Sequence, residues 1–122
     1  MAARKPVEWI GSSRSDLRRF PPEVRRVMGQ AIDDAQLGLE SPVAKAQKGF
    51  GGRGVLEIVD DFDGDTYRAV YTVRFAGVIY VLHAFQKKSK RGIATPKQEI
   101  ELIKARLKRA EEHHRTHYAK GA

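Results

Sequence analysis

The chain has 122 residues, of which 41% are hydrophobic and 31% charged, so it has room for one packed domain and is not composed like a disordered protein. It contains no cysteine, which excludes thiol catalysis and cysteine-ligated metal. The sequence has no apolar run of the roughly 18 residues that would span a bilayer, and residues 1–6 lack the apolar segment of a signal peptide. We therefore expect a cytoplasmic protein with no membrane contact and a single domain over residues 1–122.

The net charge of +8 is concentrated in the second part of the chain. Residues 1–84 contain twelve Lys or Arg and eleven Asp or Glu, whereas residues 85–122 contain eleven Lys or Arg and four Asp or Glu. Such an excess favours a polyanionic partner, and nucleic acid is the commonest one because binding releases the counterions of its phosphates. A surface that is charged only for solubility is the alternative interpretation.

The N-terminal half predicts a short strand followed by two helices. Residues 7–10 alternate weakly between apolar and polar side chains, and residues 12–20 supply serine cap residues followed by helix formers. Pro21 and Pro22 end this helix and can begin the next one. Between residues 23 and 39, apolar side chains recur every three or four positions, which is the spacing of one helix face. Residues 41–54 predict a loop, and they lack the ending and the preceding strand of a nucleotide-binding loop.

The C-terminal half predicts three antiparallel strands and a helix. The strands are expected at residues 55–59, 66–75 and 78–85, with an acidic turn at residues 60–65. Thr95, Pro96 and Gln98 predict a helix that begins at Pro96, and residues 112–122 predict a loose tail. The expected fold class is α+β, with a small antiparallel sheet of about four strands, an N-terminal helical pair and a C-terminal helix.

The segment that follows the last predicted strand is the densest group of cations in the chain. It runs from Phe85 to Arg91 and contains Lys87, Lys88, Lys90 and Arg91. Cations crowded on one loop repel one another unless an anion joins them, although such a loop can also be merely solvated. The hairpin order places Arg68 at the same strand end as Lys87 and Lys88, whereas Arg74 lies six residues further on, at a distance of about 20 Å.

Lysine and arginine side chains suit an enzyme that cleaves RNA through the RNA's own 2′-hydroxyl, because they can stabilise the charge of the pentavalent phosphorane. His83 is either a buried core histidine or a contact to RNA. Ser89 has no visible base partner, so we do not expect a nucleophilic serine. His113 and His117 share a helix face, but no third ligand is evident, and a solvated helix end is the favoured interpretation. The sequence therefore predicts no metal and no cofactor.

Residues 65–75 and 78–96 resemble the RelE/ParE toxin superfamily, and most of all the phage-derived HigB-like branch of type II toxin–antitoxin systems. The shared marks are a strand with tyrosine and arginine, an apolar strand that ends in Phe-x-Lys-Lys, and a last helix that begins with Thr-Pro. These three features follow one another in this order within residues 54–109, about half of the chain.

The resemblance implies a RelE-like fold and a toxin that arrests growth by cleaving messenger RNA, usually on the ribosome, without a metal. It also implies a helix-turn-helix antitoxin as partner. Arg68, Lys87 and Lys88 match the family's catalytic cations. Arg74, Lys90, Arg91 and His83 are expected to bind RNA.

Some relatives place a catalytic tyrosine or histidine shortly after the last strand, and residues 89–96 contain neither, so the general acid and base stay open. The alternative functions are a ParE-like toxin that inhibits gyrase and a nucleic-acid-binding relative without catalytic activity.

Overall fold

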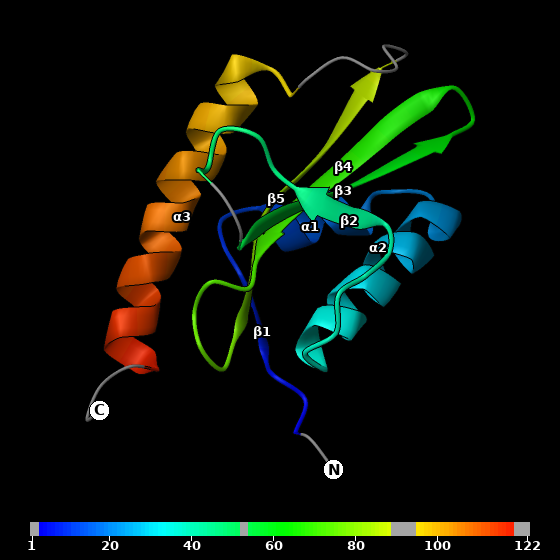
Figure 1. Cartoon of the computed structure of the whole chain (residues 1–122). Helices are drawn as coiled ribbons and strands as arrows, with labels where there is room; N and C mark the ends of the chain where they lie inside the picture. Colours follow the sequence, from blue (N-terminus) through cyan, green and yellow to red (C-terminus); the bar gives the residue numbers. More distant parts are fainter. Residues whose placement is uncertain (1–2, 52–53, 89–94, 119–122) are drawn as a thin grey trace.

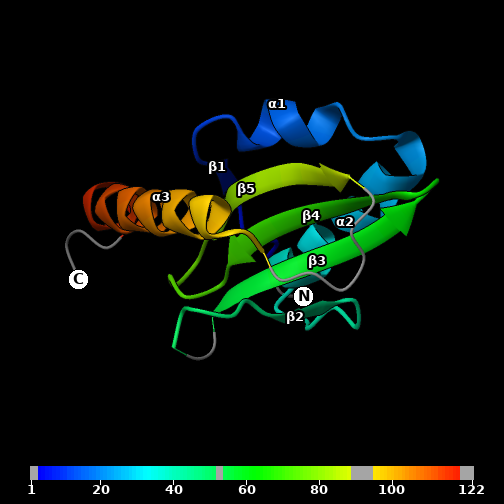
Figure 2. The ribbon, with the colours of Figure 1, turned by 90° about the horizontal axis from the view of Figure 1, so that it is seen from above.

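The computed structural model describes residues 3–51, 54–88 and 95–118, and of Lys88 the backbone alone. The five strands form one sheet in the order β1-β5-β4-β3-β2. Helices α1 and α2 cover one face of this sheet, and α3 lies on the other (Figures 1 and 2). The elements are β1 (Val7–Trp9), α1 (Ser13–Arg18), α2 (Pro22–Gln36), β2 (Ala44–Ala46), β3 (Val55–Phe62), β4 (Asp65–Thr72), β5 (Ile79–Lys88) and α3 (Lys97–His117).

The predicted α+β class, with N-terminal helices and a C-terminal helix, is confirmed. Two details of the sheet differ from the expectation of about four antiparallel strands. Strand β1 pairs with β5 in parallel, so the sheet is mixed. Strand β2 lies inside the predicted loop of residues 41–54 and pairs with β3. Its sequence, Ala-Lys-Ala, has a low strand propensity, so only the backbone pairing with β3 makes it a strand.

The hairpin between β3 and β4 sets the register of the central strands. Its turn residues Asp63 and Gly64 have φ values of 53° and 86°. The two-residue hairpin turn that matches the twist of the strands requires a positive φ at both positions. Pairing continues to Phe62 and Asp65, so the acidic stretch that predicts a turn is largely strand. Strand β4 ends at Thr72, after an irregularity between Val70 and Tyr71, and not at Phe75 as the alternation predicts.

The first face of the sheet carries the larger apolar core. The amphipathic pattern of α2 buries one stripe of side chains against alternate residues of β3, β4 and β5. The two sides contribute Val24, Met28, Ala31, Ile32 and Ala35 from α2, and Ile58, Tyr67, Ala69, Tyr71, Ile79 and Val81 from the strands.

Helix α3 covers the second face, where Ile103 and Ala110 pack with Val70 and Leu82. Strands β4 and β5 are therefore buried on both faces over these residues, as the apolar run of residues 78–85 predicts for β5. The alternation of β4 predicts one core face and a second face with exposed arginines, and for Arg68 this is wrong.

The C-terminal end of α3 is fixed to the sheet by polar contacts. The helix continues to His117, well into residues 112–122, where the sequence predicts a loose tail. The Tyr80 hydroxyl and His113 Nδ1 are 2.7 Å apart, and His114 Nε2 lies 2.9 Å from the carbonyl oxygen of Ala76. Burial raises the pKa of Tyr80 to about 12, so its hydroxyl keeps its proton and can donate to His113.

Candidate functional site

The strand register places several polar side chains on the sheet face that carries α3. Arg68 pairs with Phe85, and Val70 pairs with His83 and with Glu57. Directly paired residues project to the same side of a sheet, so these side chains share one face in adjacent rows. Helix α3 covers the part of this face around Leu82 and Val70, and its N-terminal end reaches the row of Arg68.

Arg68 forms a buried ion pair with Glu57. The Nη1 atom of Arg68 donates to Glu57 Oε2 at 3.0 Å, and the two residues are each only 7% exposed. The same nitrogen lies 3.4 Å from the hydroxyl of Thr95, and Lys45 Nζ lies 3.9 Å from the second carboxylate oxygen of Glu57. The expectation that Arg68 is an exposed cation is therefore corrected, because β4 is covered on both faces and Glu57 compensates the buried charge.

The two lysines that end β5 lie at the same end of the sheet as Arg68. Lys87 pairs with Thr66 and Lys88 with Asp65, two and three residues before Arg68 along β4. The hairpin order predicts this placement, and the register agrees with it. Lys90 and Arg91 lie outside the described residues.

Arg74 does not join this group. It lies beyond the other end of β4, in a hollow of about 280 Å³. The hollow is lined by two phenylalanines, three cations, one leucine and one glutamate: Phe50, Phe75, Arg74, Lys104, Lys108, Leu107 and Glu111. Aromatic and cationic walls are surfaces of the kind on which nucleic-acid bases stack and phosphates pair, and this hollow is separate from Arg68.

His83 is buried and has a partner at each ring nitrogen. Its Nε2 atom lies 2.5 Å from Glu99 Oε1, and its Nδ1 atom lies 3.3 Å from Arg106 Nη1. Its ring also stacks on Phe85, with the centroids 4.8 Å apart. Because the ring is enclosed in this way, His83 is not available for the direct contact with RNA that the sequence suggests.

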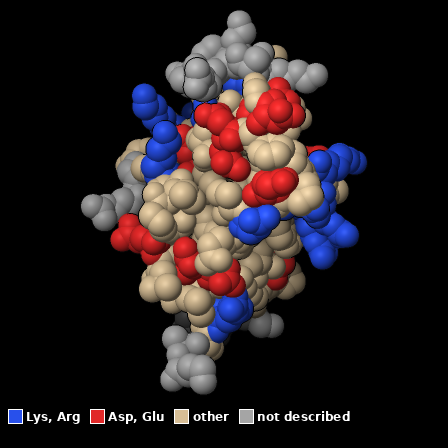
Figure 3. Space-filling model, turned by 90° about the vertical axis from the view of Figure 1, so that its right-hand side faces the viewer, with Lys and Arg blue, Asp and Glu red and all other residues tan. Residues whose placement is uncertain are grey.

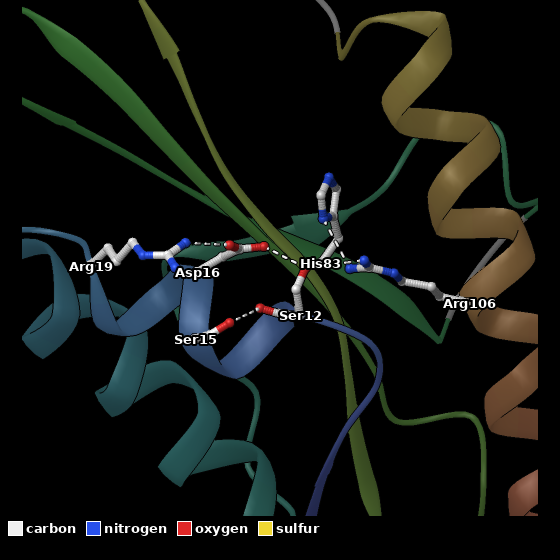
Figure 4. A network of polar contacts seen from close by, with 6 residues as sticks. All are labelled: Ser12, Ser15, Asp16, Arg19, His83 and Arg106. Atoms are coloured by element: carbon white, nitrogen blue, oxygen red, sulfur yellow. Dashed lines mark hydrogen bonds and ion pairs between the residues drawn. The ribbon is translucent and has the colours of Figure 1, made fainter.

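Arg106 links three elements of the fold. Its Nη1 atom donates to the carbonyl oxygen of Leu82 at 3.0 Å, and its Nη2 atom donates to the Ser12 hydroxyl at 3.2 Å. Figure 4 shows this guanidinium extending from α3 toward His83 and Ser12, next to the Asp16–Arg19 ion pair of α1. Burial lowers the pKa of Arg106, and Arg109 adds to this effect, whereas Asp16 and Glu99 oppose it. An arginine nevertheless stays charged in proteins.

The sequence alone did not predict roles for Glu57, Glu99 and Arg106, although it contains a signal for each. The Asp63–Gly64 turn sets a register in which Glu57 lies diagonally across from Arg68. Glu99 and Arg106 lie four residues before and three residues after Ile103, which places both on the buried side of α3. Charged residues inside an apolar helix stripe indicate buried polar partners.

Replacing Gly11 with alanine should disturb this network. Gly11 has a φ of +59°, and a Cβ atom there would lie 2.8 Å from Arg106 Nε and Cζ. Arg106 would then have to leave Leu82 and Ser12. Gly38 is the matched control, because it has a φ of +79° and nothing within 4 Å of its Cβ position. We expect Gly38→Ala to lower the free energy of unfolding in urea by about 1–2 kcal/mol, because of backbone strain. Gly11→Ala should lower it clearly more. Equal losses would show that the Arg106 contacts contribute little.

The charges on the side of the molecule where α2 and the β3–β4 turn lie are mixed. Figure 3 shows acidic and basic side chains interspersed over this face, and neither sign covers it.

Within the residues that the structure describes, no group of three or more His, Asp or Glu side chains is placed to hold a metal ion. In the same part of the chain, no helix has the length and apolarity to cross a membrane.

A comparison with protein families shows to which family the chain belongs. The family model described as "Phage derived protein Gp49-like (DUF891)" matches residues 15–108, which include all but the first two residues of α1, the whole of α2, strands β2 to β5 and the first half of α3. The chain belongs to the Gp49-like family. A search of curated proteins finds no match. In this Gp49-like chain, the buried Glu57–Arg68 pair, the lysines that end β5 and the His83–Glu99–Arg106 network all lie inside the matched segment.

Proposed function

We propose that this Gp49-like chain is the toxin of a type II toxin–antitoxin system and that it arrests growth by cleaving messenger RNA on the ribosome. Membership of a family described as phage-derived and Gp49-like supports the relation to HigB-like toxins that the sequence suggests. The main support from the fold is that the strand ends carrying Arg68, Lys87 and Lys88 lie together, in a chain whose residues 85–122 hold most of the positive charge.

The reaction in this proposal uses the RNA's own 2′-hydroxyl and no metal. The register places Lys87 on the sheet face of Arg68, where it is expected to meet the scissile phosphate and to stabilise the phosphorane. Lys88, the next residue of β5, is proposed as a further cation of the phosphate site. Arg68 is held in place by Glu57 and is about as buried as His83, so its proposed contribution is to fix the strand ends beside the phosphate site, not to contact RNA directly. Lys90 and Arg91 are proposed to bind the RNA backbone nearby.

The hollow around Arg74 is proposed as a second contact to RNA. Phe50 and Phe75 offer aromatic surface on which a base can stack, and Lys104 and Lys108 offer charge to a phosphate. Because Arg68 lies in the middle of β4 and Arg74 two residues beyond its end, about 20 Å along an extended chain, one nucleotide cannot contact both. The two places would therefore bind different nucleotides.

This chain has an apolar surface near α2 to which the proposed antitoxin can bind. Leu37, Leu39 and Val43 are exposed, and a hollow of about 330 Å³ lies between α2 and residues 41–43. An antitoxin helix bound there would keep the toxin out of the ribosome by its bulk and would leave the cations of β5 uncovered.

Expression of the chain alone should stop bacterial growth and produce new 5′ ends within the coding regions of translated messages. Lys88→Ala should abolish both effects, because it removes a cation from the phosphate site, whereas Lys48→Ala, an exposed lysine outside the site, should leave them unchanged. Growth arrest with unchanged 5′ ends and inhibited DNA supercoiling would refute the nuclease and favour a gyrase inhibitor. The absence of any arrest would refute the toxin.

A further inference from the structure

A chain of polar contacts connects the N-terminal end of α1 with the N-terminal end of α3. It runs from Ser12 to Arg106, from Arg106 to His83 and from His83 to Glu99. Figure 4 shows the first part of this chain, in which His83 and Arg106 face each other across the gap between β5 and α3. The last contact, from His83 to Glu99, is the shortest at 2.5 Å.

The partners of His83 determine where its proton lies. Arginine carries only N–H donors, so His83 Nδ1 must present its lone pair to Arg106. The ring proton is therefore on Nε2, where it is donated to the carboxylate of Glu99. An imidazolium would place two N–H donors against each other at Nδ1. In this arrangement His83 is turned toward Glu99 as a hydrogen-bond donor.

The two ends of this contact differ in accessibility. The His83 side chain is 7% exposed, whereas that of Glu99 is 29% exposed. Glu99 also lies four residues after Thr95, which precedes α3 and whose hydroxyl contacts Arg68. The Glu99 carboxylate is therefore the group of this network that a substrate at the Arg68 end of the sheet can reach. His83 contacts only one of the two oxygens of this carboxylate.

We propose that Glu99 is the general base of the RNA cleavage proposed above, and that His83 and Arg106 are positioning residues that orient its carboxylate. The inference rests on the proposed function. It supplies a proton acceptor where the segment after β5 offers neither tyrosine nor histidine.

In the proposed step, Glu99 takes the proton of the 2′-hydroxyl while the 2′-oxygen attacks the adjacent phosphorus. The bond between the 2′-oxygen and phosphorus forms, and the bond between phosphorus and the 5′-oxygen of the next nucleotide breaks. That oxygen leaves with a proton from water, and Glu99 later returns its proton to solvent. The products are a 2′,3′-cyclic phosphate and a 5′-hydroxyl end.

The test compares Glu99→Gln with Glu101→Gln in single-turnover cleavage of message on purified ribosomes. The glutamine at position 99 can still accept the hydrogen bond from His83 but cannot take a proton, and Glu101 is an exposed carboxylate two residues further along the same helix. We expect Glu99→Gln to reduce the cleavage rate at least about 100-fold with unchanged ribosome binding, and Glu101→Gln to cleave like the parent. Equal unfolding midpoints exclude a loss of fold.

The pH profile distinguishes a base from a structural contact. Among the described residues, Glu99 contacts His83 of β5 and lies near Arg106 of α3, and the Arg68 of the Glu57–Arg68 pair contacts Thr95, four residues before Glu99. The rate of the parent should fall toward acid pH, as expected for a reaction that needs an unprotonated base, and the residual rate of Glu99→Gln should lack this dependence.

Arg106→Lys tests the positioning role. It should lower the maximal rate and leave the substrate concentration at half-maximal rate unchanged. Cleavage by Glu99→Gln at the rate of the parent would overturn the proposal and leave the nuclease intact. A parent that does not cleave message at all would instead refute the proposed function.

Discussion

Replacing Arg68 with alanine is expected to lower the free energy of unfolding by about 3–5 kcal/mol, because it leaves the Glu57 carboxylate buried without its arginine. The sequence alone suggests an exposed arginine, for which the loss would be below about 0.5 kcal/mol. Urea unfolding followed by circular dichroism measures the difference. Arg74→Ala is the matched control, since Arg74 is an exposed arginine of the same hairpin.

A second variant separates the loss of the ion pair from a loss of packing. Replacing Glu57 and Arg68 together with leucine and methionine removes both charges and keeps most of the volume, so it should be far closer to the parent in stability than Arg68→Ala. An Arg68→Ala protein as stable as Arg74→Ala would contradict the buried pair. Any loss of toxicity in Arg68→Ala must accordingly be compared at equal amounts of folded protein.

Leu82→Ala is expected to destabilise the domain by about 2–5 kcal/mol, because it opens a cavity between β5 and α3. Leu82 is 0% exposed, and Ile103 and Ala110 of α3 belong to the same core. Leu102→Ala on α3 serves as control, since that leucine is 37% exposed and should change the unfolding midpoint much less. Similar losses for the two leucines would mean that α3 is bound loosely to the sheet.

The order of the elements could be predicted from the sequence wherever periodicity was strong. The stripe of α2 and the apolar run of β5 follow from local patterns, and the structure agrees with them. The turn predicted over residues 60–65 is confined to Asp63 and Gly64. Strand β2 and the parallel pairing of β1 could not be predicted in this way, because both depend on partners far along the chain. Local alternation likewise does not show whether a second layer covers a strand.

The candidate site could be predicted in its location but not in its contacts. The hairpin order places Arg68, Lys87 and Lys88 at one end of the sheet, and the register agrees. The burial of Arg68 depends on Glu57 of the neighbouring strand and on α3, and the orientation of His83 depends on Arg106, twenty-three residues away. Those pairs come from tertiary packing, which single-sequence periodicity does not contain.

The parallel pairing of β1 with β5 has a consequence for biosynthesis. Val7 pairs with Ile79, so the first strand has no partner until most of the chain has left the ribosome. The β3–β4 hairpin, with partners close in sequence, can form earlier, whereas the apolar stripe of α2 must wait for the strands that cover it. Contacts between such distant residues make folding slow and expose apolar surface during synthesis. A nascent chain of this topology completes its sheet only after β5 has emerged, which leaves an interval in which another protein can bind α2 before the domain closes.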